Sequence, residues 1–349
     1  MRAPEARYPH VVRALAESPW AVLPSTFEAI CEVVALRLEG RGLGEEEISA
    51  RIAAGAGRRE PYPASGGQIA VVPLYGVLMP RANLMTEMSG GTSLERAGAA
   101  IAQAAADPQV SAIVLDVNSP GGAVGMTPET AAQVREARRS KRVVAVANTL
   151  AASGAYWLAS QADEVVASPS ALLGSIGVIS IHEDVSAQQE QRGVRTTIIR
   201  AGRFKGEGNP LEPLTDEGRA ALQAMADHYY GMFVADVARG RGVGRDEVRT
   251  GFGEGRVLVA ADAVRAGLAD RVDTLEATIV RIAREQAAPG RARAGAAAEH
   301  DGTDQTQPSE HQPAAEAGQK DGADIDGRLL AEIRDRLQET TTRLKEAHT

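Results

Sequence analysis

Residues 143–160 read VVAVANTLAASGAYWLAS. The β-branched run at 143–147 predicts a buried strand, and the small apolar residues that follow, with Tyr156 and Trp157, predict the start of a buried helix. Ser153 lies where the strand changes into the helix. Unpaired backbone N–H groups at a helix N-terminus favour a developing negative charge. Ser153 is therefore a candidate nucleophile for acyl transfer, and the alternative is an ordinary helix N-cap.

Strands and helices alternate on both sides of this stretch. Such alternation indicates βαβ units, so we predict an α/β fold with a mostly parallel sheet. The strands are expected at Ile69–Leu74, Ala112–Val117, Val143–Ala147, Glu164–Ala167, Gly177–Ile181 and Arg195–Arg200, and the helices at Ser93–Ala106, Pro128–Arg138, Ala155–Ser160, Val185–Gln191 and Thr215–Arg239.

Composition divides the chain into four parts. Residues 1–60 show helical spacing of apolar side chains and predict a helical arm, with a capping box at Ser25. Residues 68–285 form the main domain. Large apolar residues nearly vanish over 286–327, which predicts disorder, and residues 328–349 predict a short amphipathic helix.

The overall composition excludes several classes of protein. The formal net charge of −8 over 349 residues argues against a nucleic-acid partner. The single cysteine, Cys31, allows no intramolecular disulfide, which fits a cytoplasmic protein. We find no apolar run long enough to cross a membrane. We also find no Cys/His cluster and no phosphate-binding glycine motif, so we expect a soluble protein without a metal or a cofactor.

A second candidate element is the sequence DVNSPGG at 116–122. It follows a predicted strand, and its two glycines allow the backbone to turn so that an N–H group points into a cleft. If this strand and the one before Ser153 are neighbours, the N–H groups of Gly122 and Gly154 can form an oxyanion hole. The alternative is an ordinary turn, because Pro-Gly-Gly is common in turns.

The candidate general base is Lys205, in the glycine-flanked sequence AGRFKGEGNP at 201–210. A lysine amine is protonated at neutral pH in water, so it must lose solvation before it can accept a proton from a serine. Most lysines are solvated surface groups, and that alternative stays open here. The only competing base in the main domain is His182, which follows a predicted strand. A further serine, Ser175, precedes that strand and could orient the lysine amine through a hydrogen bond.

Five of these motifs, taken in order, resemble the S49 serine peptidases, the signal peptide peptidase A family. They are SPGG, AASGAYWLAS, GSIGVIS, AGRFKGEGNP and GRVLVAADAVRAGLADRVD, and the resemblance covers roughly residues 68–275. The resemblance implies a ClpP/crotonase-like fold and a Ser/Lys dyad. It assigns Ser153 as the nucleophile, Lys205, 52 positions later, as the base, and Ser175 as the residue that supports the lysine.

The arm sequence PWAVLP at 19–24 is similar to that of the phage minor capsid protein C branch of this family. The resemblance implies an endopeptidase of a phage head, with a protein substrate such as a capsid scaffold, and a homo-oligomer. It would act in the host cytoplasm or in the procapsid. Alternatives are a host cytoplasmic S49 peptidase in quality control, a crotonase-type acyl-CoA enzyme, and a non-catalytic scaffold protein.

Overall fold

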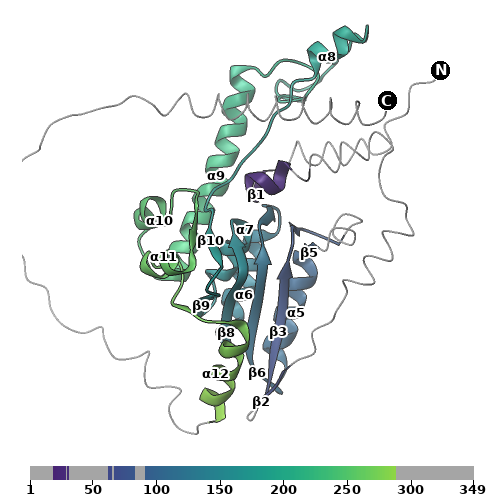
Figure 1. Cartoon of the computed structure of the whole chain (residues 1–349). Coiled ribbons are helices and arrows are strands. Elements are labelled where there is room, and N and C mark those ends of the chain that lie inside the picture. Colours follow the sequence, from purple (N-terminus) through teal and green to yellow (C-terminus); the bar gives the residue numbers. More distant parts are fainter. Residues whose placement is uncertain (1–18, 29, 31–61, 65–66, 83–90, 288–349) are drawn as a thin grey trace, which may run out of the picture. The chain divides into compact units, whose positions relative to one another are not determined.

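The central sheet of the computed structural model is α/β and mostly parallel. The structure describes residues 19–28, 30, 62–64, 67–82 and 91–287. Parallel pairing joins β3 (Gly67–Tyr75) to β6 (Val110–Ser119), β6 to β8 (Arg142–Ala152), and β8 to β9 (Glu164–Ala167). The predicted α/β class is confirmed, and strands were expected at all four of these positions (Figure 1).

Strand β8 pairs with two successive strands on the same side. Its residues 144–147 pair with β9, and its residues 150–152 pair with β10 (Leu172–Gly174), which also runs parallel to it. The pairing with β6 shifts between Val117 and Asn118, so two extra residues of β8 are accommodated there. As a result the carboxyl ends of β6, β8 and β10 lie side by side, where ligands bind in open α/β sheets.

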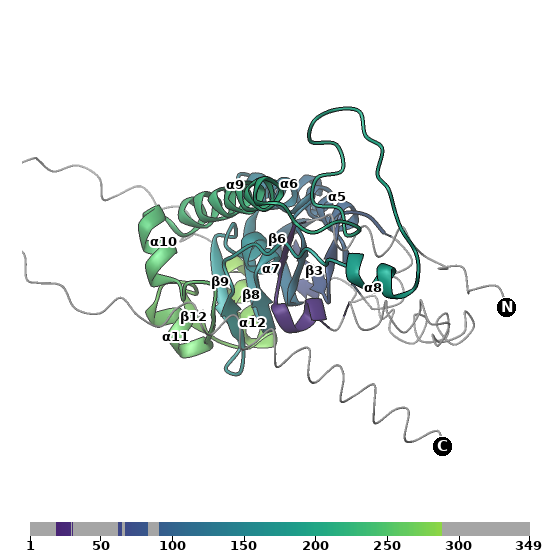
Figure 2. The same cartoon turned by 90° about the horizontal axis from the view of Figure 1, so that it is seen from above.

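Helices cover both faces of the sheet (Figure 2). One face packs on α12 (Leu275–Ala287), and the other on α5 (Leu94–Ala106), α6 (Thr127–Ala137) and α9 (Asp216–Arg241). Successive residues of a strand point to opposite faces. In β6, Val114 accordingly belongs to the cluster under α12, while Ile113 and Leu115 belong to the larger cluster on the other side.

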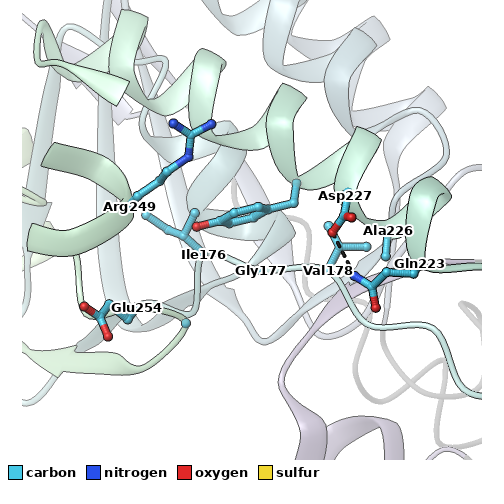
Figure 3. Close-up of a pocket in the computed structure, with 10 residues that line it drawn as sticks. Ile176, Gly177, Val178, Gln223, Ala226, Asp227, Arg249 and Glu254 are labelled. Atoms are coloured by element: carbon cyan, nitrogen blue, oxygen red, sulfur yellow. Dashed lines mark hydrogen bonds between the residues drawn. The ribbon is translucent and has the colours of Figure 1, made fainter. Parts of the chain in front are cut away.

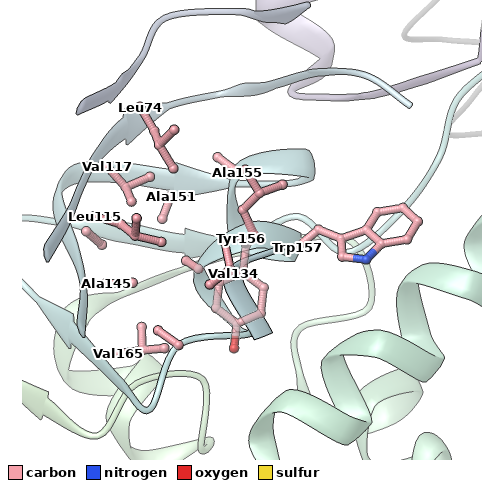
Figure 4. Packing of buried hydrophobic residues seen from close by; sticks show 14 of the residues in the cluster. Leu74, Leu115, Val117, Val134, Ala145, Ala151, Ala155, Tyr156, Trp157 and Val165 are labelled. Carbon is pink, nitrogen blue, oxygen red and sulfur yellow. The ribbon is translucent and has the colours of Figure 1, made fainter. Parts of the chain in front are cut away.

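The helix that follows Ser153 is fully buried. All six residues of α7 (Gly154–Ala159) are buried, and Figure 4 shows Tyr156 and Trp157 within the main core. The Trp157 ring stacks on Phe233 of α9 with the ring centroids 4.4 Å apart. The Tyr156 hydroxyl donates to the Leu268 carbonyl at 2.9 Å, and burial raises the pKa of Tyr156. These contacts hold the start of α7 in a fixed position.

A second, smaller sheet lies at the carboxyl ends of these strands. It has the order β1 (Trp20–Val22), β7 (Gly121–Ala123), β4 (Leu78–Met79) and β5 (Thr92–Ser93). The arm was expected to be helical, but residues 20–22 form a strand that pairs with β7. The helix after it begins at Pro24, with the Leu23 carbonyl accepting from Phe27, so Ser25 is not its cap. The rest of the arm lies outside the described residues, as do the tail segments.

Two predicted strands are wrong. Residues 177–181 contain only an isolated bridge, between Ile179 and Trp20, and residues 195–200 form no strand. Ile199 is 94% exposed, so the apolar pattern there has no sheet to pack against. A strand is stable only when neighbours pair with it, and periodicity alone cannot show this.

The remaining elements lie at the edges of the sheet or beyond them. They are β2 (Tyr62–Ala64), α8 (Ser186–Gln191), α10 (Arg245–Gly251), β11 (Val257–Val259), α11 (Ala260–Arg265) and β12 (Arg271–Val272). No helix within these described parts is long and apolar enough to cross a membrane.

An ion pair joins α9 to the loop between α11 and β12. Asp270 accepts from the Arg241 guanidinium through both carboxylate oxygens, at 2.7 and 3.0 Å, and from the Val165 N–H at 2.7 Å. Burial would raise the pKa of Asp270, but the hydrogen bonds from Arg241 and Val165 outweigh it, so the pKa of Asp270 is lowered. A carboxylate whose pKa is lower in the folded than in the unfolded protein stabilises the fold at every pH above its unfolded-state pKa. This stabilisation is lost as the pH falls through the folded-state pKa.

We therefore expect Asp270→Asn to lower the free energy of unfolding by about 1.5–3 kcal/mol at pH 7, as for hydrogen bonds to a charged group. The difference from wild type should shrink as the pH falls below about 4, near the pKa of an unfolded aspartate. Urea unfolding at pH 7 and pH 3.5 measures both values. The control is Asp262→Asn, because Asp262 pairs with Arg265 on the surface, where the effect should stay below about 1 kcal/mol. An Asp270→Asn deficit that is the same at both pH values would contradict the assignment.

Candidate active site

Ser153 has a backbone conformation that is unusual for a serine. Its φ is 52° and its ψ is −122°, and it is 1% exposed. Its N–H donates to the Gly174 carbonyl at 2.7 Å, and its hydroxyl lies 3.4 Å from the Gly177 carbonyl oxygen. The side chain makes no capping hydrogen bond to α7, so the N-cap alternative does not account for this serine. A non-glycine residue at positive φ is costly and persists where the surrounding structure imposes it.

The glycine pair after β6 lies next to Ser153. The Gly121 N–H donates to the Ser119 hydroxyl at 3.2 Å, so it is not free to hold an oxyanion. A Cβ added to Gly154 would lie 3.6 Å from the Gly122 nitrogen, so the two backbone segments are adjacent. Only glycine fits at 122, since a Cβ there would lie 1.9 Å from the Leu78 carbonyl oxygen of β4. The predicted neighbour relation of the two strand ends is present.

Ser175 lies beside the candidate nucleophile. It follows Gly174, the residue whose carbonyl accepts from the Ser153 N–H, and it is 6% exposed. Its own φ is 52°, and its N–H donates to the Arg256 carbonyl at 2.8 Å. The carboxyl ends of β8 and β10 thus bring together two buried serines, both at positive φ.

Lys205 is not brought to Ser153 in this chain. It is exposed, in a turn between α8 and α9 where its N–H donates to the Gly202 carbonyl at 3.1 Å. Figure 1 shows α8 well separated from the sheet. The competing base, His182, lies in the same excursion of the chain, with its Nε2 3.1 Å from the Asn209 carbonyl oxygen. The structure therefore groups Ser153, Gly122, Gly154 and Ser175 but places both candidate bases elsewhere.

Strand β1 lies across the candidate site, a position that the sequence does not predict. It pairs antiparallel with β7, with Ala21 opposite Gly122, and Trp20 forms a two-way backbone bridge with Ile179. The Ala21 carbonyl oxygen would lie 3.1 Å from a Cβ on Gly154. The signal in the sequence is the short apolar run between Pro19 and Pro24, which by its resemblance indicates only the family branch.

A cavity of 310 Å³ lies on another side of the segment that follows Ser175. Ile176, Gly177 and Val178 form one wall, and Asp227 of α9 lies on the facing wall (Figure 3). Tyr230 of α9 also lines the cavity. The remaining lining residues are Gln223, Ala226, Arg249, Glu254 and Gly255. The cavity shares residues 176–178 with the surroundings of Ser153, but Ser153 does not line it. Among the residues that the structure describes, no cluster of His, Cys, Asp and Glu could hold a metal ion.

The sequence of this chain is similar to the sequences of several known proteins. Residues 135–288 match the model of peptidase family S49. The chain is 34% identical over 239 residues to the capsid assembly protease C of Escherichia phage lambda, which covers 67% of this chain and 54% of that protein. It is 36% identical over 204 residues to the head-tail preconnector protein GP5 of Enterobacteria phage P21, covering 58% of this chain and 40% of that protein.

Relatives also occur outside phages. Protease 4 of Salmonella typhi is 30% identical over 220 residues, which cover 63% of this chain and 35% of that protein. The chain thus spans about half the length, or less, of these relatives. The resemblance inferred from the five motifs is confirmed, and so is the ClpP-like class of fold that it implied. These matches show that this chain carries a peptidase S49 domain.

Proposed function

We propose that this protein is a serine endopeptidase in which Ser153 is the nucleophile. The observation that carries the proposal is the buried Ser153 at positive φ, without a capping bond, beside the backbone of Gly122 and Gly154. In this arrangement the Ser153 hydroxyl attacks the substrate carbonyl, and the Gly122 and Gly154 N–H groups stabilise the oxyanion that forms. Loss of the amine then leaves an acyl-enzyme, which water hydrolyses.

Lys205 is our proposed base. It accepts the proton of the Ser153 hydroxyl during attack and returns it to the leaving amine. The exposed turn that carries Lys205 must therefore approach Ser153 when substrate binds, either within one chain or between two copies. Ser175, next to Ser153, is proposed to hydrogen-bond the lysine amine once it arrives.

A homo-oligomer is also part of the proposal. The excursion between β10 and α9 exposes Ile199, Phe204 and Val194, which are 94%, 56% and 52% exposed. Exposed apolar groups that gather on one segment are typical of an interaction surface. A second copy that covers this segment would bury these groups and could hold the Lys205 turn in place.

The biological setting that we favour is a phage or prophage head, with a capsid or scaffold protein as the substrate. Support comes from the two phage relatives, whose names place them in head assembly. A host S49 peptidase in quality control is the second candidate, favoured by the likeness to Protease 4. The net charge of −8 favours a protein partner over a nucleic acid.

The test is to incubate the purified chain with the scaffold and capsid proteins encoded beside it and to identify the products by mass spectrometry. We expect discrete cleavage products from the wild type and none from Ser153→Ala. Cleavage of unrelated unfolded proteins but not of these would favour the quality-control role. Turnover of acyl-CoA thioesters by Ser153→Ala, without any peptide cleavage by the wild type, would refute the endopeptidase proposal and favour the crotonase-type alternative.

A further inference from the structure

The strand β1 lies in the position that an extended substrate peptide needs. An extended peptide binds by adding a strand to an exposed sheet edge, where main-chain hydrogen bonds supply affinity. The edges that face Ser153 are β7 on one side and the segment at Ile179 on the other. Both are occupied by residues 19–23 of the same chain.

The register puts one particular carbonyl at the candidate oxyanion hole. Val124 donates to the Pro19 carbonyl at 3.2 Å, and Leu23 donates to the Pro120 carbonyl at 2.9 Å. Hydrogen-bonded pairs alternate along an antiparallel ladder, so the pair between them, Ala21 with Gly122, is of the bonded type. The Gly122 N–H therefore faces the Ala21 carbonyl, as it would face the carbonyl of a bound substrate.

The side chain of Ala21 is enclosed next to Gly154. Ala21 is fully buried, and a Cβ on Gly154 would lie 3.7 Å from the Ala21 Cβ. On the other side of the strand, Trp20 bridges Ile179 through both backbone groups, with each bond at 2.9 Å. The bound segment thus has an alanine at the position next to Ser153 and a backbone held from both sides.

The strand can leave without opening the main core. Its apolar side chains belong to a small separate cluster, in which the Trp20 and Phe27 rings meet edge to face at 5.5 Å. The other buried members are Val22, Ile30 and Ala123. Because most of this cluster comes from residues 20–30 themselves, that segment can detach as a unit.

We propose that residues 19–23 are an internal occupant of the substrate site, which blocks it in this state and must be displaced before a peptide can bind. On the basis of the proposed function, the preferred substrate is an extended segment with alanine, or a residue of similar size, at the position of Ala21. The peptide bond that this substrate presents to Ser153 is the one that follows that residue.

The test measures binding of a fluorescent peptide with the sequence of residues 18–25, SPWAVLPS, to full-length Ser153→Ala protein, which cannot cleave it. In one variant, Ala21→Asp adds a carboxylate to a fully buried site and should release the strand. Another variant combines Pro19→Cys, Ser180→Cys and Cys31→Ser. A disulfide between positions 19 and 180 should lock the strand in the site. Because Trp20 and Ile179 are a bonded pair, positions 19 and 180 face each other as a non-bonded pair, whose spacing suits a disulfide.

We expect the peptide to bind at least tenfold more tightly to the Ala21→Asp variant than to Ser153→Ala protein with the native residues 19–23. Binding to the oxidised lock should be lost and should return on reduction. The Ser25→Ala variant changes an exposed residue near the strand and should bind the peptide as tightly as protein with the native residues 19–23. In the variant with Pro19→Cys alone, oxidation should leave peptide binding unchanged. If circular dichroism shows that Ala21→Asp is unfolded, the oxidised and reduced forms of the lock decide.

Equal binding to locked and reduced protein, or no binding to any form, would overturn the inference. The readout needs no catalysis, so the two proposals can fail separately. If the variants rank in peptide binding as expected but the protein with Ser153 intact cleaves no peptide, the endopeptidase proposal is refuted and the internal occupant stands. A chain that cleaves peptides but binds equally in all forms would refute only the internal occupant.

Discussion

Replacing Ser153 by alanine is expected to lower the rate of peptide cleavage by at least about 10⁴-fold, because removal of a nucleophile leaves only the contribution of the oxyanion hole and of binding. Stability should change little. The side chain makes one long contact, at 3.4 Å to the Gly177 carbonyl, and the strained backbone is imposed by the neighbouring strands. Initial rates on a peptide identified from the products, together with urea unfolding, give both quantities.

The matched control is Ser160→Ala at the other end of α7. Ser160 is also fully buried, and its hydroxyl donates to the Trp157 carbonyl at 2.9 Å, away from the Gly122 and Gly154 N–H groups. It should cost about 0.5–1.5 kcal/mol of stability and leave the cleavage rate per folded molecule close to that of wild type. Cleavage by Ser153→Ala within tenfold of wild type would show that another group is the nucleophile.

Replacing Lys205 by alanine is expected to lower the cleavage rate by about 10²–10⁴-fold, the range for loss of a general base. Lys205→Arg should be equally impaired, because arginine keeps its proton in proteins. Neither change should alter stability, since Lys205 is exposed in this state.

Two variants in the same excursion serve as controls. Arg203→Ala removes an exposed cation whose ion pair with Glu217 is on the surface, and it should keep most of the activity. His182→Ala tests the competing base and should also remain active. An inactive His182→Ala beside an active Lys205→Ala would reverse the assignment. Mixing Ser153→Ala with Lys205→Ala distinguishes the two ways of supplying the base, because activity returns on mixing only if one copy serves another.

The sequence by itself was enough to determine the scaffold. Strands β3, β6, β8 and β9 and helices α5 to α9 lie where hydrophobic periodicity and end signals predicted them. These signals are local, since buried strands need continuous β-branched runs and helices need a spacing of three to four residues. The Ser153 junction and the Gly122 turn could be found for the same reason, as each is a change of backbone conformation within a few residues.

Only the tertiary structure decided which segments pair and what lies over Ser153. Residues 195–200 have the composition of a strand but find no neighbour, whereas the three residues of β1 pair with β7 and one of them, Trp20, also bridges Ile179. Pairing is a relation between distant parts of the chain, here Ala21 with Gly122, and the sequence of neither part specifies it. The same holds for Lys205: its glycine-flanked turn could be recognised from sequence, but its separation from Ser153 depends on how the excursion between β10 and α9 leaves the sheet.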